Sequence, residues 1–328
     1  MSKAISKDKK LKYIAAGLGA VLIVSALLLV ISLWERGQGT FDGESGAESV
    51  FTHEGVEYAP KSGVETFLVM GLDSFDGEGD KGGYSNDRQA DFLMLLVFDN
   101  ESRTTAAVHI NRDTLVDVNL LGVAGNTIST ERKQIALAYN EGNGREVSCR
   151  NTADSVSSLL CGIKVNHYVS LTMDSVAVFN DLVGGVELEI MDDFTGIDDS
   201  LVKGQTLRLS GEQALTYVRS RQGLEDSSNS TRMVRQQQYL NALYNSTVAK
   251  LAEDEQFVAS AALRMGEYIV SDRSVTQLED ILRRFSDYEF TGIRSIAGET
   301  VMGEQFYEFH ADETAVRSLV AELFYVAK

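Results

Sequence analysis

Four arginines lie close together in residues 209–238, within a stretch rich in polar side chains: Arg219, Arg221, Arg232 and Arg235. The whole chain has 48 acidic and 30 basic residues and a formal net charge of -18, so this cluster differs from its surroundings. Guanidinium groups bind phosphate and carboxylate oxygens through paired hydrogen bonds. The cluster therefore predicts a site for a specific anion, against the alternative of a solvated edge with surface ion pairs.

The elements around the cluster determine which of these side chains can act together. Good helix formers fill residues 231–252, and Arg232 and Gln236 are four residues apart, so they point the same way on one helix. The amino-terminal end of a helix also carries a partial positive charge and unpaired backbone donors. Arg219 and Arg221 face the same side if their segment is extended.

Three aspartates stand at the ends of predicted strands and offer a second half to the site. Asp73 follows the apolar run FLVM, Asp91 opens DFLMLLVF, and Asp113 closes VHINRD. Carboxylates that meet a bound anion need a cation between them, and Mg²⁺ commonly bridges carboxylates to phosphate oxygens. These aspartates are therefore candidate Mg²⁺ ligands. Turn formation and helix capping are the alternative interpretation.

Residues 13–34 contain no charged side chain. As a helix they span about 33 Å, enough to cross a membrane. Five lysines and one aspartate lie in residues 1–12, which the positive-inside tendency places in the cytoplasm. We expect a single-pass protein of the cell membrane with an uncleaved transmembrane helix, rather than a cleaved signal peptide, and an extracytoplasmic remainder.

The exported part divides into two regions. Residues 35–64 are rich in Gly, Glu and Ser and predict a flexible stalk, and residues 65–328 are long enough for a folded domain. Because the cytoplasmic tail carries +4 of the total -18, the rest of the chain carries -22. Such an acidic domain argues against a nucleic-acid partner.

Short apolar runs alternate with helix-like segments, which predicts an α/β fold with a central sheet covered by helices. The predicted strands are residues 67–70, 92–98, 105–110, 167–171 and 186–190. The predicted helices in the same region are residues 155–160 and 175–183.

The chain has two cysteines, Cys149 and Cys161, both in the exported part. A disulfide between them closes a short loop and stabilises the fold by about 3 kcal/mol. Two free thiols are the alternative, because no sequence rule fixes the geometry. The four histidines show no metal-ligand spacing, so no zinc site is expected.

Six motifs follow one another in order along the exported part. They are GLDS at 71–74, ADFLMLLVFD at 90–99, INRDTLVDV at 110–118, NHYVSLTMDSVAVFNDLVGGVELEI at 166–190, LSGEQALTYVRSR at 209–221 and RMVRQQQYL at 232–240. Each motif alone is weak, whereas the ordered set is specific. The set closely resembles the LytR-CpsA-Psr family, from about residue 65 to the end of the chain.

This resemblance implies a three-layer α/β/α sandwich with a central mixed sheet. Family members are bacterial, membrane-anchored enzymes that transfer a glycopolymer from an undecaprenyl pyrophosphate carrier to peptidoglycan. They hold the pyrophosphate with arginines and Mg²⁺, and the lipid tail in an apolar pocket. Apolar residues between 163 and 190 can line such a pocket, and they equally suit an ordinary core.

The resemblance also assigns roles to individual residues. Catalytic roles fall on Arg112, Asp113, Arg219 and Arg221. Substrate-binding roles fall on Arg88, Asn229, Arg232 and Gln236. Metal-binding roles fall on Asp73, Asp91 and Asp113, whereas Arg235 receives none.

Two positions depart from the family pattern. Gln89 stands where an arginine is common, so either Arg88 reaches the site through a local bulge or the site has one guanidinium fewer. Asn229 stands where an aspartate is common; its amide forms hydrogen bonds but carries no charge. Asp226 is a candidate substitute for that carboxylate.

The function expected from this site is attack of an acceptor hydroxyl on the phosphorus that joins the first sugar to its carrier. Guanidinium groups and Mg²⁺ then stabilise the departing lipid phosphate, and Asp113 or Asp226 is the candidate base. Two alternatives use the same residues. One is a regulatory attenuator module that binds polyprenyl pyrophosphate, and the other is a lipid pyrophosphatase with water as acceptor.

Overall fold

The computed structural model describes residues 51–73, 88–220, 229–254, 257–273 and 288–328 except Gln305, together with Gln277 and Phe285. The predicted cytoplasmic tail and transmembrane segment lie outside these residues. Among the helices that are described, none has the length and apolar character needed to cross a membrane.

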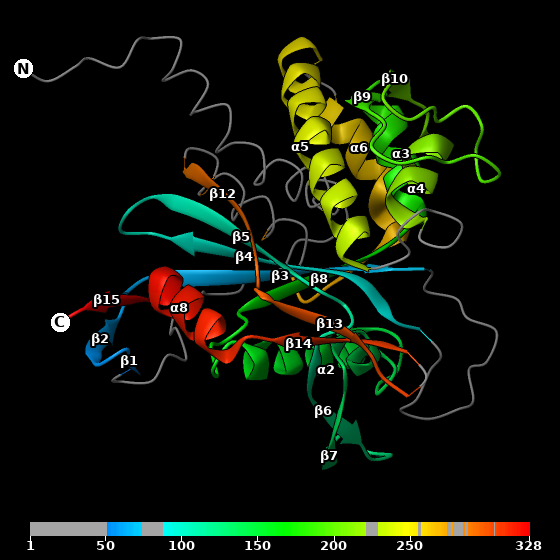
Figure 1. Ribbon diagram of the computed structural model, residues 1–328. Helices are drawn as coiled ribbons and strands as arrows, with labels where there is room; N and C mark the ends of the chain where they lie inside the picture. Colours follow the sequence, from blue (N-terminus) through cyan, green and yellow to red (C-terminus); the bar gives the residue numbers. More distant parts are fainter. Residues whose placement is uncertain are drawn as a thin grey trace, which may run out of the picture.

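A six-stranded mixed sheet forms the centre of the molecule, in the strand order β11-β8-β3-β4-β5-β12 (Figure 1). Its strands are β3 (Val64–Leu72), β4 (Ala90–Asp99), β5 (Thr104–Ile110), β8 (His167–Thr172), β11 (Ile269–Ser271) and β12 (Glu289–Ser295). Strands β8, β3, β5 and β12 run the same way, and β4 and β11 run against them. The carboxyl ends of four strands and the start of β4 therefore share one edge. The predicted central mixed sheet is confirmed.

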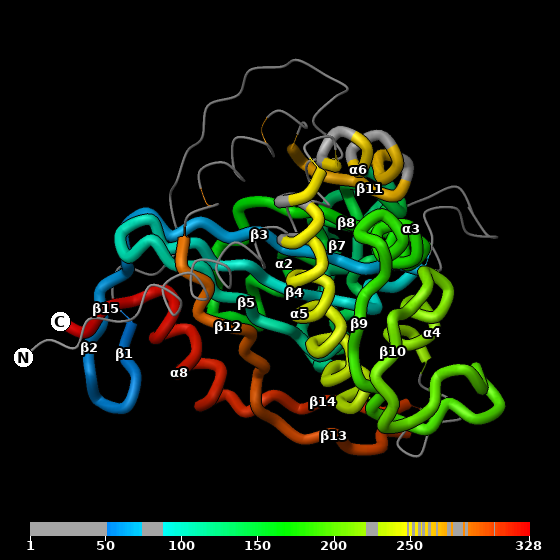
Figure 2. Tube along the Cα trace, turned by 90° about the horizontal axis from the view of Figure 1, so that it is seen from above, coloured from blue at the N-terminus to red at the C-terminus, as the bar shows by residue number. Residues whose placement is uncertain are grey.

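Helices cover both faces of this sheet, because successive side chains of a strand point to opposite sides. Leu68 and Met70 pack in one core cluster with residues of α2 and α8, whereas Phe67 and Val69 pack on the other face against Leu240 of α5. The first face carries η1 (Ile135–Tyr139), α2 (Glu146–Leu159) and α8 (Glu313–Phe324). The second carries α3 (Asp174–Leu182), α4 (Gly211–Arg219), α5 (Asn229–Glu253) and α6 (Phe257–Met265). Figure 2 shows α5 crossing the sheet with α3 and α4 to one side of it.

Residues 51–60 are folded, so the predicted stalk through residue 64 is wrong in this part. Strands β1 (Phe51–His53) and β2 (Val56–Pro60) join the carboxyl-terminal strand β15 (Tyr325–Ala327) in a three-stranded sheet. The ring of Phe51 stacks on that of Tyr325 with centroids 4.7 Å apart. The full sheet could not be predicted from local sequence, because one of the two strands that pair with β2 lies at the opposite end of the chain.

Three antiparallel hairpins and a short 3-10 helix, η2 (Gly266–Tyr268), complete the described elements. The hairpins are β6–β7 (Leu115–Leu121 and Thr127–Gln134), β9–β10 (Val186–Glu189 and Thr206–Leu209) and β13–β14 (Gly298–Met302 and Tyr307–Ala311). Strand β14 returns to the edge where β5 ends, because the backbone N–H of Phe309 donates to the carbonyl of Asp113 at 2.9 Å.

The segment around Arg219 is helical, so the extended arrangement considered for it is wrong. Helix α4 begins with a capping box between Ser210 and Gln213 and runs to Arg219, while Arg221 lies outside the described residues. Cys149 and Cys161 are not joined by a disulfide in this structure, and Cys149 is buried on α2.

Candidate active site

The predicted site residues that the structure describes gather where strands β3 and β5 end and β4 begins. Asp73 directly follows β3, Asp91 is the second residue of β4, and Arg112 and Asp113 follow β5. On the helical side, Arg219 is the last residue of α4, and Asn229, Arg232 and Gln236 lie in the first turns of α5. Chain segments far apart in sequence thus meet at one edge of the sheet.

Arg112 lies between the two strands and joins their carboxylates. Its Nη1 forms an ion pair with Asp91, its Nε lies 3.4 Å from Oδ1 of Asp113, and its Nη2 donates to Oε1 of Gln89 at 2.5 Å. The pairing of β3 with β4 shifts register at Gly71, which leaves Asp91 as the extra residue of a bulge. Bulges of this kind redirect side chains beside active sites.

Asp113 is the most enclosed of the three aspartates, with 2% of its surface exposed. Nε2 of Gln134, at the end of β7, lies 3.3 Å from Oδ1 of Asp113 and 2.7 Å from the carbonyl of Tyr307. Gln134 therefore ties the carboxylate to the β13–β14 hairpin. Gln134 could not be predicted from the sequence, because an exposed strand carries no signal that one of its side chains turns inward.

Arg219 and Asp73 form a looser pair than Arg112 and its partners. Nη2 of Arg219 lies 3.1 Å from Oδ1 of Asp73, and 54% and 58% of the two side chains remain exposed. An exposed pair of this kind contributes little to stability, about 0–1 kcal/mol. Both groups are therefore available to a ligand at modest cost.

Asn229 links helix α5 to the end of β5. Its Nδ2 donates to Oδ1 of Asn111 at 2.6 Å, and its Oδ1 accepts from Nη2 of Arg232. Both Asn229 and Arg232 are buried. An ionised aspartate cannot donate to Asn111, so the amide at this position serves a contact that the common family residue does not offer.

Three other polar residues contact other parts of the chain. The guanidinium of Arg88 lies against Gly144, which has a φ of +75° and where a Cβ would collide with the guanidinium. Gln236 donates to the carbonyl of Val218 at 3.2 Å. Arg235 is 1% exposed and pairs with Asp192 at 2.5 Å, in a structural contact.

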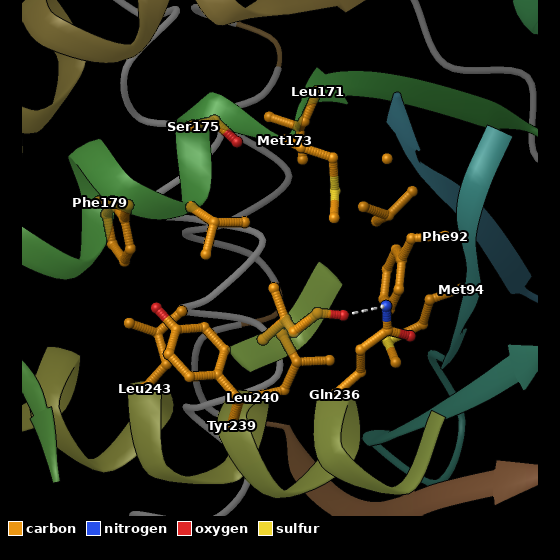
Figure 3. Close-up of a pocket in the computed structure, with 14 residues that line it drawn as sticks. Phe92, Met94, Leu171, Met173, Ser175, Phe179, Gln236, Tyr239, Leu240 and Leu243 are labelled. Carbon is orange, nitrogen blue, oxygen red and sulfur yellow. Dashed lines mark hydrogen bonds between the residues drawn. The ribbon is translucent and has the colours of Figure 1, made fainter. Parts of the chain in front are cut away.

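An almost wholly apolar pocket opens between the sheet and helices α3, α4 and α5 (Figure 3). Its cavity volume is about 100 Å³. Leu171, Met173 and Phe179 come from the segment predicted to line such a pocket. Strands β3 and β4 and helix α5 supply further lining residues, among them Met94 and Leu243.

A model of the LytR_cpsA_psr family matches residues 41–323. The chain belongs to this family. The resemblance seen in the six ordered motifs is thereby confirmed, and it extends upstream of residue 65 into the region that contains β1 and β2.

Several known proteins resemble the chain over most of its length. It is 23% identical to the polyisoprenyl-teichoic acid–peptidoglycan teichoic acid transferase TagU of Bacillus licheniformis, over 97% of this chain and 96% of that protein. The crystal structure of B. subtilis TagV has a TM-score of 0.56 and 25% identity, covering 79% of this chain and 96% of that one. TagT bound to LIIa-WTA has a TM-score of 0.56 at 19% identity, covering 79% and 89%, and shows the same fold.

The residues of this LytR_cpsA_psr member offer oxygen ligands that fit Mg²⁺. No group of three or more His, Cys, Asp or Glu side chains gathers around a metal position in the part of the chain that the structure describes. Asp91 and Asp113 nevertheless converge on the single guanidinium of Arg112. Two carboxylates close enough to share one cation match the one or two that Mg²⁺ usually takes alongside phosphate oxygens and water.

His109 is a further residue of the site that sequence analysis did not assign. It is 1% exposed, its ring lies 4.9 Å from that of Phe92, and Nε2 of Gln237 donates to its Nδ1 at 3.3 Å. Burial, and secondarily the charge of Arg232, lower the pKa of His109 to about 3. The imidazole is therefore neutral in the folded protein at neutral pH.

His109→Gln is expected to reduce the decrease in the free energy of unfolding that occurs as the pH falls. The pKa of His109 is lowered from 6.5 to about 3 by folding, so below pH 6.5 the unfolded chain binds one proton more than the folded one. Stability then falls by about 1.4 kcal/mol per pH unit as the pH drops towards 3. In urea unfolding between pH 6 and pH 4, the free energy of unfolding should fall less steeply with decreasing pH in the variant. His310→Gln, at a more exposed histidine, is the control. If the free energy of unfolding depends on pH equally in the unmodified protein and both variants, the lowered pKa of His109 is contradicted.

Proposed function

We propose that this protein transfers a glycopolymer from an undecaprenyl pyrophosphate carrier to peptidoglycan, with Mg²⁺ at the carboxylates and arginines around the pyrophosphate. The observation that carries the proposal is the junction of an apolar pocket with a charged edge. A lipid pyrophosphate needs both surfaces side by side, one for its hydrocarbon tail and one for its phosphates.

The pocket and the charged edge meet at several points of the chain. Phe92 lines the pocket directly after Asp91, and Val218 lines it directly before Arg219. Gln236 lines it one helical turn after Arg232. A tail in the pocket therefore brings its phosphates to these charged side chains.

The relatives support the same assignment. The name of TagU specifies a polyisoprenyl-linked teichoic acid and a peptidoglycan acceptor, and the alignment covers 97% of this chain. The pair Arg219–Asp73 and the trio around Arg112 supply guanidinium and carboxylate groups of the kind that such a substrate requires.

In the proposed reaction the acceptor hydroxyl oxygen forms a bond to the phosphorus of the sugar phosphate. The bond from that phosphorus to the bridging oxygen breaks, the hydroxyl proton passes to a base, and lipid monophosphate leaves. When bound, Mg²⁺ would supply positive charge to the phosphate oxygens. Arg219 and Arg112, with Arg221, bind the oxygens on which negative charge grows.

The aspartates divide between two tasks in this scheme. Asp73 and Asp91 would hold Mg²⁺ when it is bound. Asp113 is buried and bound by Arg112 and Gln134, which suits a carboxylate that orients Arg112 and completes the metal site better than one that meets the acceptor. The base role then falls to Asp226, which lies outside the described residues.

The membrane supplies the setting for this chemistry. An uncleaved helix at residues 13–34 holds the chain to the outer face of the cell membrane, where the carrier lipid resides. The pocket and arginines then act on a substrate that shares the same surface.

Val176→Phe is expected to reduce binding of the lipid tail selectively. Val176 lines the pocket from α3, and a phenyl ring there fills space that the tail needs. Binding of a long polyprenyl phosphate should weaken about tenfold, while inorganic pyrophosphate binds as before. Fluorescence titration of both ligands measures the difference. Equal loss of both ligands shows that the substitution disturbs the whole site and that the pocket is not specific for the tail.

Purified protein offered a lipid-pyrophosphate glycan, peptidoglycan fragments and Mg²⁺ tests the function directly. Covalent transfer to the fragments supports the proposal. Release of phosphate without transfer identifies a lipid pyrophosphatase, and binding without turnover identifies a regulatory attenuator module.

A further inference from the structure

Gln89 stands where the family pattern commonly has an arginine, and it contacts Arg112 directly. Its Oε1 accepts from Nη2 of Arg112 at 2.5 Å. The other two nitrogens face carboxylates, since Nη1 pairs with Asp91 and Nε lies 3.4 Å from Asp113. Nε of Arg112 makes no hydrogen bond, so the contacts with Asp91 and Asp113 are ion pairs, whereas Gln89 forms a hydrogen bond with the guanidinium.

An ion pair attracts a guanidinium with little dependence on direction, whereas a hydrogen bond also fixes its orientation. The carboxylates of Asp91 and Asp113 supply the attraction, and Gln89 supplies the directional contact. An amide oxygen adds no charge beside a proposed phosphate site. An arginine at position 89 has no acceptor atom and cannot make this contact, and a carboxylate adds negative charge that repels phosphate.

Arg88 does not perform this task. An arginine has no acceptor atom to offer Arg112, and the guanidinium of Arg88 lies against Gly144, two residues before α2. Where the family pattern commonly has an arginine, this chain therefore has Gln89, which contacts the guanidinium of Arg112.

We infer that Gln89 is a positioning residue that orients the guanidinium of Arg112 towards the pyrophosphate of the carrier. This inference rests on the proposed function, in which Arg112 binds that pyrophosphate. A hydrogen bond to a charged group is strong enough that its loss weakens binding through a misoriented guanidinium about tenfold.

The test uses the full chain in detergent, with inorganic pyrophosphate and Mg²⁺ as the calorimetric probe. Gln89→Met keeps the side-chain length and removes the acceptor, and it should bind pyrophosphate about tenfold more weakly with an unchanged unfolding temperature. Gln205→Met is the matched control, because Gln205 is an exposed glutamine in the loop before β10. It should bind as the unmodified protein does.

A double-mutant cycle separates positioning from a direct effect. Arg112→Met should weaken binding strongly, and Gln89→Met should add nothing in that background, because Gln89 acts only through Arg112. Arg112→Lys, which keeps the charge, gives a second background if Arg112→Met does not fold. Unchanged pyrophosphate binding by Gln89→Met overturns the positioning role. An undiminished loss of affinity when Gln89→Met is added to the Arg112 variants overturns it as well. Unchanged binding by Arg112→Met instead removes Arg112 from the proposed function, and the positioning role with it.

Discussion

Arg219→Ala is expected to lower the rate of glycopolymer transfer about 100- to 1000-fold while the fold is unaffected. Loss of one preorganised donor to a developing oxyanion has an effect of this size. The stability cost is small, because Arg219 and Asp73 form an exposed pair 3.1 Å apart. Transfer to peptidoglycan fragments and thermal unfolding, measured on the same preparation, check both halves of this expectation.

Arg208→Ala is a matched control for Arg219→Ala. Arg208 pairs with Glu187 at 3.3 Å, and 61% and 58% of these two side chains are exposed, so both arginines sit in similar surface pairs. Arg208 lies on β10, away from the strand ends that carry the site, and its removal should leave transfer unchanged. Arg221→Ala is expected to behave like Arg219→Ala. Undiminished transfer by the double variant Arg219→Ala/Arg221→Ala excludes the arginine cluster from catalysis.

Much of the central sheet could be predicted from local sequence, because its strands are buried on both faces. Residues 67–70 and 92–98 are nearly continuous apolar runs, and both lie within observed strands. Helix α2 was predicted only at its carboxyl end. Its first turns bury Ser148, Asn151 and Thr152, and Asn151 donates to the carbonyls of neighbouring segments, so polar residues interrupt the buried apolar face.

The positions of the site residues could be predicted, but not their contacts. Motifs mark Asp91, Arg112 and Asp113 because each stands at a strand end. That Arg112 lies between the two aspartates depends on the bulge in β4 and on the pairing of β4 with β5. The direction of Arg88 depends on the positive φ of Gly144, which lies some fifty residues further along the chain. Contacts of this kind follow from tertiary structure and leave no local pattern.

Asp91→Asn is expected to raise the Mg²⁺ concentration for half-maximal transfer at least tenfold. The substitution keeps the volume of the side chain and an oxygen that accepts from Arg112, but it removes the negative charge that a hard divalent cation prefers. Asp117→Asn is the control, since Asp117 lies on β6 in an exposed pair with Arg132. Transfer measured over a Mg²⁺ series, together with calorimetric Mg²⁺ binding in the presence of inorganic pyrophosphate, gives the two readouts.

The same variant distinguishes two roles for Asp91. If Asp91 is a metal ligand, added Mg²⁺ restores part of the transfer, because the weakened site fills at higher concentration. If Asp91 only holds Arg112 in place, transfer falls at every Mg²⁺ concentration and the half-maximal concentration does not move. The second result removes Asp91 from the metal site, and it leaves Asp73 and Asp113 as the carboxylates that hold Mg²⁺. Because Arg112 joins Asp91 to Asp113, that result also predicts that the reductions in transfer rate caused by Arg112→Met and Asp91→Asn are not additive.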